Sequence, residues 1–128
     1  MLLFGHKYIK AENFYHISSI DDVVKTPPNS IIYLIFDERN LDIIEYLNQN
    51  NILFALHVKN ISELIFAYNL QASYITVDID FAKTAQDIAE NYLFDAKILT
   101  HIKYDEDIQT VAKLGIDGAL FPTAIVKV

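Results

Sequence analysis

The chain contains no cysteine and no tryptophan, and its 128 residues include only three glycines and three prolines. Without cysteine there is no disulfide, no thiolate nucleophile, no zinc finger and no iron–sulfur cluster. Three glycines are too few for the glycine-rich phosphate loops of the Rossmann or Walker type. The lack of cysteine is compatible with the cytoplasm, which is the location we expect.

Basic residues are also scarce. Nine scattered lysines and one arginine, Arg39, stand against 17 acidic residues, and the net charge is −7. Binding a phosphate backbone requires clustered Lys and Arg, so we expect no nucleic-acid partner. The longest apolar run, Ile31 to Phe36, is far shorter than the about 18 residues of a membrane-spanning helix. The amino-terminal residues have no basic segment followed by a long apolar one, so we expect neither a secretory signal nor a membrane partner.

Apolar residues, in contrast, are plentiful. They make up 52% of the chain, with eight Phe and eight Tyr, and the mean hydropathy is +0.21. This composition supports one hydrophobic core, and the length fits a single domain over residues 1–128. The apolar surplus predicts an exposed patch that a protein partner or a second copy covers, as in a homo-oligomer.

Short apolar segments recur at a spacing of about 21 residues, with helical patterns between them. The expected strands are Phe14–Ile17, Ile31–Phe36, Ile52–Val58, Ser73–Val77, Lys97–Ile102 and Gly118–Phe121, and the expected helices cover 40–48, 63–70, 81–94 and 106–114. This alternation predicts βα units and a mostly parallel sheet of about six strands. We predict an open, doubly wound, Rossmann-like α/β domain of three layers. The alternative is a TIM-barrel fragment or half-barrel, since six strands do not close a standard barrel.

The ends of these elements give further expectations. Ser62, Asp80 and Asp105 are the expected helix N-caps, and Gly115 is an expected left-handed C-cap. Residues 1–12 fit the pattern least well, and we expect either an edge strand around Lys7–Ile9 or an arm that reaches a partner.

Histidine and aspartate alternate at the expected strand ends. The residues at these ends are His16, Asp37, His57, Asp78, His101 and Pro122, at spacings of 20 to 23. Ligands of parallel α/β proteins bind at the carboxyl ends of the strands, so this alternation predicts a site there. An acidic residue also follows each of the three histidines by six positions, as Asp22, Glu63 and Asp107. This part of the pattern is typical of capping, because an acid in the first helical turn complements the helix dipole.

Three kinds of site fit the alternation. For acid–base catalysis the candidates are His57, His101 and Asp78, with a carboxylate orienting an imidazole. For a metal the candidates are His16, His57 and His101. For a small ligand the candidates are Asp37, His57, Asp78, His101, Lys103 and Thr123. In a flat sheet, residues on alternate strands lie about 10 Å apart, so only curvature or a second copy would gather the histidines.

The last fourteen residues, Gly115 to Val128, read GIDGALFPTAIVKV. This segment resembles the final strand and phosphate loop of phosphate-binding TIM barrels of the tryptophan synthase α-subunit type. The family pattern is Gly-Ala-Asp-Gly, three aliphatic residues, then Gly-Ser-Ala-Ile-Val-Lys, and it covers about a tenth of the chain. The resemblance implies a strand over Ala119–Phe121 whose end faces a phosphate. Thr123 matches the serine, but Pro122 replaces the glycine whose N–H meets the phosphate, and proline has no N–H.

Three classes of function follow from these observations. We favour a non-catalytic accessory or interaction domain that self-associates, because neither a nucleophile elbow nor a zinc-protease motif is present. The first alternative is a binder of a small anionic or phosphorylated ligand at the strand ends. The second is a metal-dependent or acid–base enzyme that uses the strand-end His and Asp residues. We predict no cofactor.

Overall fold

The computed structural model describes residues 1–128 and contains one sheet of eight parallel strands. The strands are β1 (Leu2–Phe4), β2 (Phe14–His16), β3 (Ile31–Ile35), β4 (Phe54–His57), β5 (Tyr74–Val77), β6 (Lys97–His101), β7 (Gly118–Leu120) and β8 (Ile125–Lys127). The helices are α1 (Leu41–Gln49), α2 (Ile61–Asn69), α3 (Ile79–Asn91) and α4 (Asp105–Leu114), with 3-10 turns η1 (Ile20–Lys25), η2 (Glu38–Asn40) and η3 (Pro122–Ala124). The predicted βα units and parallel sheet are therefore confirmed.

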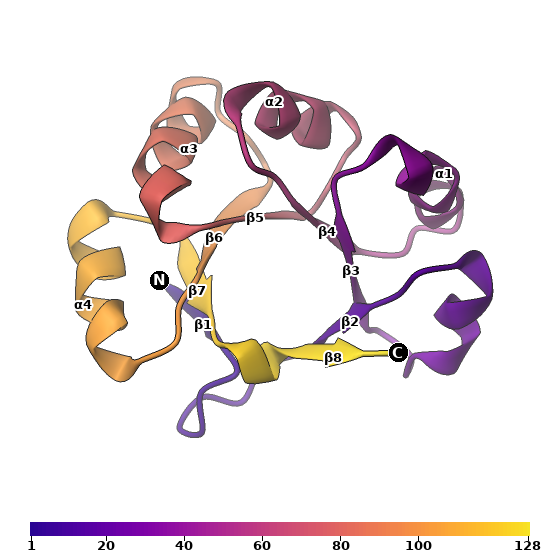
Figure 1. Ribbon diagram of the computed structural model, residues 1–128, viewed down its shortest axis with the longest axis horizontal. Helices are drawn as coiled ribbons and strands as arrows, with labels where there is room; N and C mark the ends of the chain where they lie inside the picture. The colour runs from indigo at the N-terminus through magenta and orange to yellow at the C-terminus, as the bar shows by residue number, and fades with distance from the viewer.

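The sheet is curled into a half-barrel and not opened into a doubly wound sheet. Its strands, in the order β1-β7-β6-β5-β4-β3-β2-β8, sweep through 267°, and α1 to α4 all lie outside them (Figure 1). From β2 to β7 each strand is added beside the previous one, so right-handed crossovers place every helix on the same face. A doubly wound sheet needs a reversal of strand order, which this chain lacks. The prediction of an open, three-layer, Rossmann-like domain with about six strands was wrong, and the half-barrel alternative fits the structure.

The half-barrel has two cores, which explains why several strands are apolar on both faces. The outer core packs the sheet against the helices and includes Ile32, Leu56 and Ile98 from the strands. The inner core fills the interior of the curl with eight buried residues: Phe4, Phe14, Ile31, Tyr33, Ala55, Leu99, Leu120 and Ala124. Phe4, Phe14 and Tyr74 meet edge to face, with ring centroids 5.0 to 5.8 Å apart. The interior is therefore filled with packed side chains, as in a closed barrel.

The helices lie close to their predicted ranges, but three begin earlier than expected. Their N-caps are Asn60, Asp78 and Tyr104, and not Ser62, Asp80 and Asp105. The C-cap of α4 was predicted correctly, since Gly115 has φ +73°, which favours glycine. No helix combines the length and apolar character that a membrane crossing requires.

The amino-terminal segment forms the edge strand in another place than predicted. The strand is β1, which pairs with β7, whereas Lys7–Ile9 forms a turn. Close packing here requires glycine: a Cβ atom on Gly118 would lie 2.7 Å from the Leu2 carbonyl oxygen. The curl leaves β1 and β8 as the two edge strands, and the Phe121 N–H extends the β1–β7 ladder by donating to the Phe4 carbonyl. Two arcs of 267° exceed a full circle, so two copies do not combine into one closed barrel.

Candidate functional site

The carboxyl ends of the strands meet at one end of the half-barrel, which we call the mouth. His16, His57 and His101 end β2, β4 and β6, which are alternate strands. The register pairs are His16 with Tyr33, Tyr33 with Ala55, His57 with Thr76, and Thr76 with Leu99. Each histidine therefore lies two residues further along the register than the one before it. Tilted barrel strands are staggered by about one residue per strand, so this shift brings the three histidines to a similar height.

Four side chains from four successive strands form what we call the imidazole network: the buried Tyr33 and Thr76, and the partly buried His57 and His101. The Thr76 hydroxyl oxygen lies 2.9 Å from His57 Nδ1 and 3.3 Å from His101 Nε2. The Tyr33 hydroxyl lies 3.3 Å from the same His101 Nε2. The rings of His57 and His101 meet edge to face with centroids 5.0 Å apart. Curvature of the sheet has therefore gathered residues that a flat sheet would hold about 10 Å apart.

Thr76 links the protonation of the two rings. A threonine hydroxyl donates a single hydrogen bond. It contacts both His57 and His101, so at least one of these rings must carry its proton on the nitrogen that faces Thr76. His16 stands beside the imidazole network and not in it, since its ring contacts that of Tyr33 edge to face at 5.2 Å.

Burial keeps the histidines of the mouth uncharged near neutral pH. Burial, with a smaller contribution from His57, lowers the pKa of His101 to about 4. Burial also lowers the pKa of His57, although the carboxylate of Asp78 opposes the shift. The pKa of His16 is lowered by burial and by the ammonium of Lys127. These rings therefore act at pH 7 as hydrogen-bonding groups and not as cations.

A pocket of about 540 Å³ opens at the mouth beside His16 and His101. Its charged wall consists of Asp78, Lys103 and Lys127. The Asp78 carboxylate lies 3.9 Å from His57 Nε2 and is 71% exposed. Neither lysine takes part in any of the protein's ion pairs. The mouth thus combines neutral imidazoles with two free cations and one exposed carboxylate.

Two predicted ligand-binding residues are occupied elsewhere. Asp37 caps η2 and accepts hydrogen bonds from the backbone and guanidinium of Arg39, which lower its pKa to about 2. The Thr123 hydroxyl donates to the Gly5 carbonyl at 2.7 Å. In the phosphate-loop-like segment, Phe121 follows β7 and Pro122 opens η3.

The acids that follow the histidines cap the helix starts, as predicted. Asp22 Oδ2 accepts from the backbone N–H groups of Ser18 and Ser19 at 3.0 and 3.2 Å. In the second and third repeats the acceptors are Glu63, from Lys59 N–H, and Asp107, from Lys103 and Tyr104 N–H. In all three repeats the donor lies two residues after the histidine. The six-residue spacing therefore lets the acidic side chain accept hydrogen bonds from the loop that joins each strand to the next helix.

Sequence reasoning missed Tyr33 and Thr76. Both have polar tips inside apolar strand segments, and both are buried, at 6% and 0% exposure. Their signal is strand alternation, because Thr76 stands two residues before Asp78 and so faces the same side of its strand. The signal becomes readable only when the inner face of the strand is known.

The histidines do not form a ready metal site. No group of three or more His, Asp or Glu side chains is arranged to hold a metal ion. His57 Nδ1 and His101 Nε2 are engaged with Thr76. A metal held by these rings and His16 would require the rings to turn out of their present hydrogen bonds.

The arrangement does support proton transfer in principle. His57 is 13% exposed, and its Nε2 faces Asp78. A neutral imidazole at this position is able to accept a proton from a bound molecule, and the nearby carboxylate would stabilise the resulting cation. This is the chemistry on which the acid–base hypothesis for His57, His101 and Asp78 depends.

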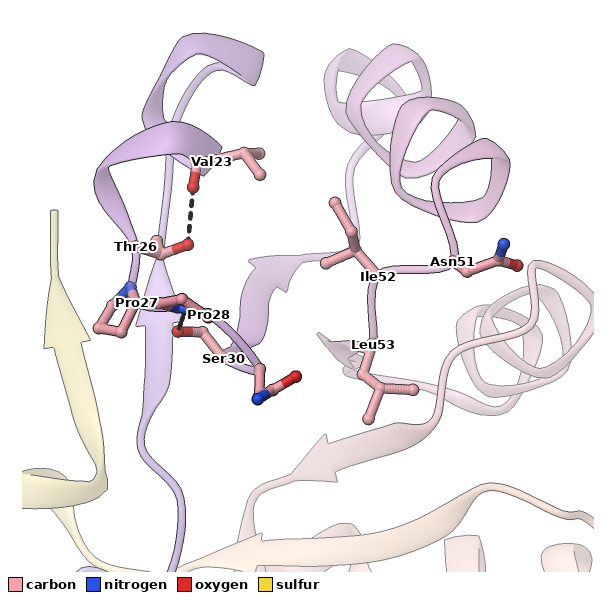
Figure 2. A pocket seen from close by; sticks show the side chains of 9 residues that line it. Val23, Thr26, Pro27, Pro28, Ser30, Asn51, Ile52 and Leu53 are labelled. Atoms are coloured by element: carbon pink, nitrogen blue, oxygen red, sulfur yellow. Dashed lines mark hydrogen bonds between the residues drawn. The ribbon is translucent and has the colours of Figure 1, made fainter.

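Another hollow, of about 390 Å³, lies at the opposite end of the half-barrel (Figure 2). Its lining includes Pro27, Pro28 and Ser30 before β3, and Leu53 before β4. The Thr26 hydroxyl donates to the Val23 carbonyl at 2.7 Å, as Figure 2 shows. None of the nine lining side chains is titratable, so this hollow offers packing but no acid–base chemistry.

No protein-family model matches the chain, and a search of curated proteins finds no match. The function is therefore inferred from the chemistry of the mouth itself.

Proposed function

We propose that the protein binds a small anionic molecule at the mouth of the half-barrel. The observation that carries this proposal is the imidazole network, which places two neutral histidines from β4 and β6 in direct contact. Buried polar groups cost stability unless they are hydrogen-bonded, and aliphatic residues at these positions would pack without that cost. A set of satisfied polar groups at the ligand-binding end of a parallel α/β fold is best explained by ligand recognition.

The charge of the ligand follows from the pocket wall. Lys103 and Lys127 present ammonium groups without a carboxylate partner, on a protein whose net charge is −7. Each neutral imidazole has one N–H group, and at least one of His57 and His101 directs it at Thr76. The N–H groups left to donate to an anion are therefore those of His16 and of at most one ring of the network, and they add no charge. An anion with one negative charge and small size would satisfy the lysines without a strong conflict with Asp78.

A matched pair of threonines tests the proposal. Thr76 and Thr100 are both completely buried, but Thr76 belongs to the imidazole network whereas the Thr100 hydroxyl has no hydrogen-bond partner. We expect small organic anions, such as benzoate, to shift the ring signals of His16 and His101 in NMR spectra. Benzamide, the uncharged analogue of benzoate, should not shift them. Thr76→Val should weaken the binding of the anions, and Thr100→Val should leave it unchanged. The proposal would be contradicted if the uncharged analogues bind as tightly as the anions, or if no anion shifts the ring signals of these histidines.

Self-association is a second candidate, supported by the outer face of α2. Ile61 and Phe66 are 49% and 54% exposed, and Phe66 stacks on Phe36 with centroids 5.9 Å apart. A helix that is apolar on most of its surface usually has a partner on each side. Light scattering at high protein concentration should then detect a dimer that Phe66→Ser dissociates. A strict monomer would contradict this candidate and leave the ligand proposal intact.

A further inference from the structure

We infer that the ligand at the mouth is a small amphipathic monoanion, namely an organic carboxylate with an apolar body. This inference rests on the proposed function and specifies its substrate class. It depends on which side chains line the pocket beside the imidazole network and on which anion-binding groups this chain lacks.

The pocket also has apolar residues in its lining. These residues are Ile79 at the start of α3, Ile102 directly after β6, Pro122 at the start of η3, and Ile125 in β8. Ile102 is already buried in the outer core, so the apolar side chains that remain accessible here are the other three. The volume of about 540 Å³ lies within the range typical of small-molecule sites. A wholly polar ligand would leave these three side chains facing polar atoms. A ligand with an aliphatic or aromatic body would remove them from water.

The carboxylate is assigned to the lysine side of the pocket. Lys127 follows Ile125 by two residues on β8 and pairs in register with His16. Its ammonium therefore stands at the rim, above an apolar side chain on the same face of the strand. The ammonium also acts on the His16 imidazole, whose pKa it helps to lower. A carboxylate between Lys127 and Lys103 would leave the ligand body against Ile125 and Ile79.

A phosphate dianion fits this pocket less well. Pro122 has no N–H to donate, and the Thr123 hydroxyl already donates to Gly5. The one arginine, Arg39, is held by Asp37. The exposed carboxylate of Asp78 on the pocket wall would repel a second negative charge. The groups that usually cradle phosphate are therefore missing or engaged, and a monoanion remains.

The experiment is a titration of the protein with acetate, butanoate, hexanoate and inorganic phosphate, followed by the ring signals of His16 and His101. His6, which contacts Asp105 and Phe121 outside the pocket, is the internal control. Hexanoate should bind about tenfold more tightly than butanoate if two further methylene groups are buried. Phosphate should bind more weakly than hexanoate.

Two pairs of variants locate the head and the body of the ligand. Lys127→Met should weaken the binding of all three carboxylates. Its control is Lys113→Met, which removes an equal charge from the last turn of α4, at the other end of the molecule, and should leave their binding unchanged. Ile79→Thr should weaken the binding of hexanoate and leave the binding of acetate unchanged. Its control is Ile61→Thr, because Ile61 is likewise the exposed first residue of a helix but lies outside the pocket.

The outcomes separate the two proposals. If phosphate binds at His16 and His101 as tightly as hexanoate, the ligand class is wrong while anion binding at the mouth stands. The same conclusion follows if affinity does not rise with chain length or if Ile79→Thr leaves hexanoate binding unchanged. If no probe moves these rings, both the class and the proposed function are overturned.

Discussion

At the scale of single residues, the main feature is a set of imidazoles that the fold keeps neutral. The pKa of His101 falls to about 4 from the usual 6.5 because the charged ring would lose its hydration. His57 and His16 shift in the same direction, so each carries less positive charge in the folded protein than in the unfolded chain.

This shift predicts a loss of stability on acidification. Between pH 6.5 and pH 4 the unfolded chain binds a proton on His101 that the folded protein does not, so unfolding becomes more favourable as pH falls. The full effect of a shift of this size is about 3 kcal/mol of unfolding free energy. Urea denaturation at a series of pH values measures it. His101→Gln, which stays neutral throughout, should flatten the dependence, and an unchanged slope would contradict the burial of His101.

The two buried threonines give a second prediction at this scale. Thr76→Val leaves His57 Nδ1 without its partner and should lower the free energy of unfolding by about 1–3 kcal/mol. Thr100→Val removes a buried hydroxyl that has no partner, so stability should stay constant or rise by up to about 1 kcal/mol. Urea midpoints of the two variants provide the measurement. Equal losses from both would mean that the Thr76 contacts contribute nothing.

At the scale of elements, the acids that follow the histidines connect each strand end to the next helix. Asp107 accepts two backbone hydrogen bonds at the start of α4, whereas its neighbour Glu106 accepts none. Asp107→Ala should therefore cost about 1 kcal/mol of stability. Glu106→Ala removes the same charge from the same helical turn and should cost little. Thermal denaturation of both variants distinguishes capping from a general effect of charge, which would make the two losses equal.

Most of these elements were readable from the sequence. The apolar segments, the C-cap at Gly115 and the capping acids follow from local patterns, because periodicity and helix-end chemistry are local. The N-caps at Asn60, Asp78 and Tyr104 were missed because more than one polar residue near each helix start fits the pattern. The edge strand was misplaced because Leu2–Phe4 is too short to show alternation.

At the scale of the whole molecule, the sequence pattern leaves open whether the sheet is doubly wound or curled into a half-barrel, and strand order decides between them. The same βα units build a doubly wound sheet or a barrel, and the difference is whether strand order reverses. That choice depends on contacts between residues far apart in the chain, such as the pairing of β8 with β2 and of β1 with β7. The histidine repeat indicated candidate residues, but only the curl brings His57 and His101 together. It also leaves Asp37 outside, at the start of η2.

The curl of the sheet is tested most directly by nuclear Overhauser contacts between the ring protons of His57 and His101. The ring centroids lie 5.0 Å apart across the mouth, so a cross-peak between the two rings is expected at pH 7. In an open, flat sheet the same residues would stand on alternate strands about 10 Å apart. No cross-peak would then appear. Its absence would contradict both the half-barrel and the site built at its mouth.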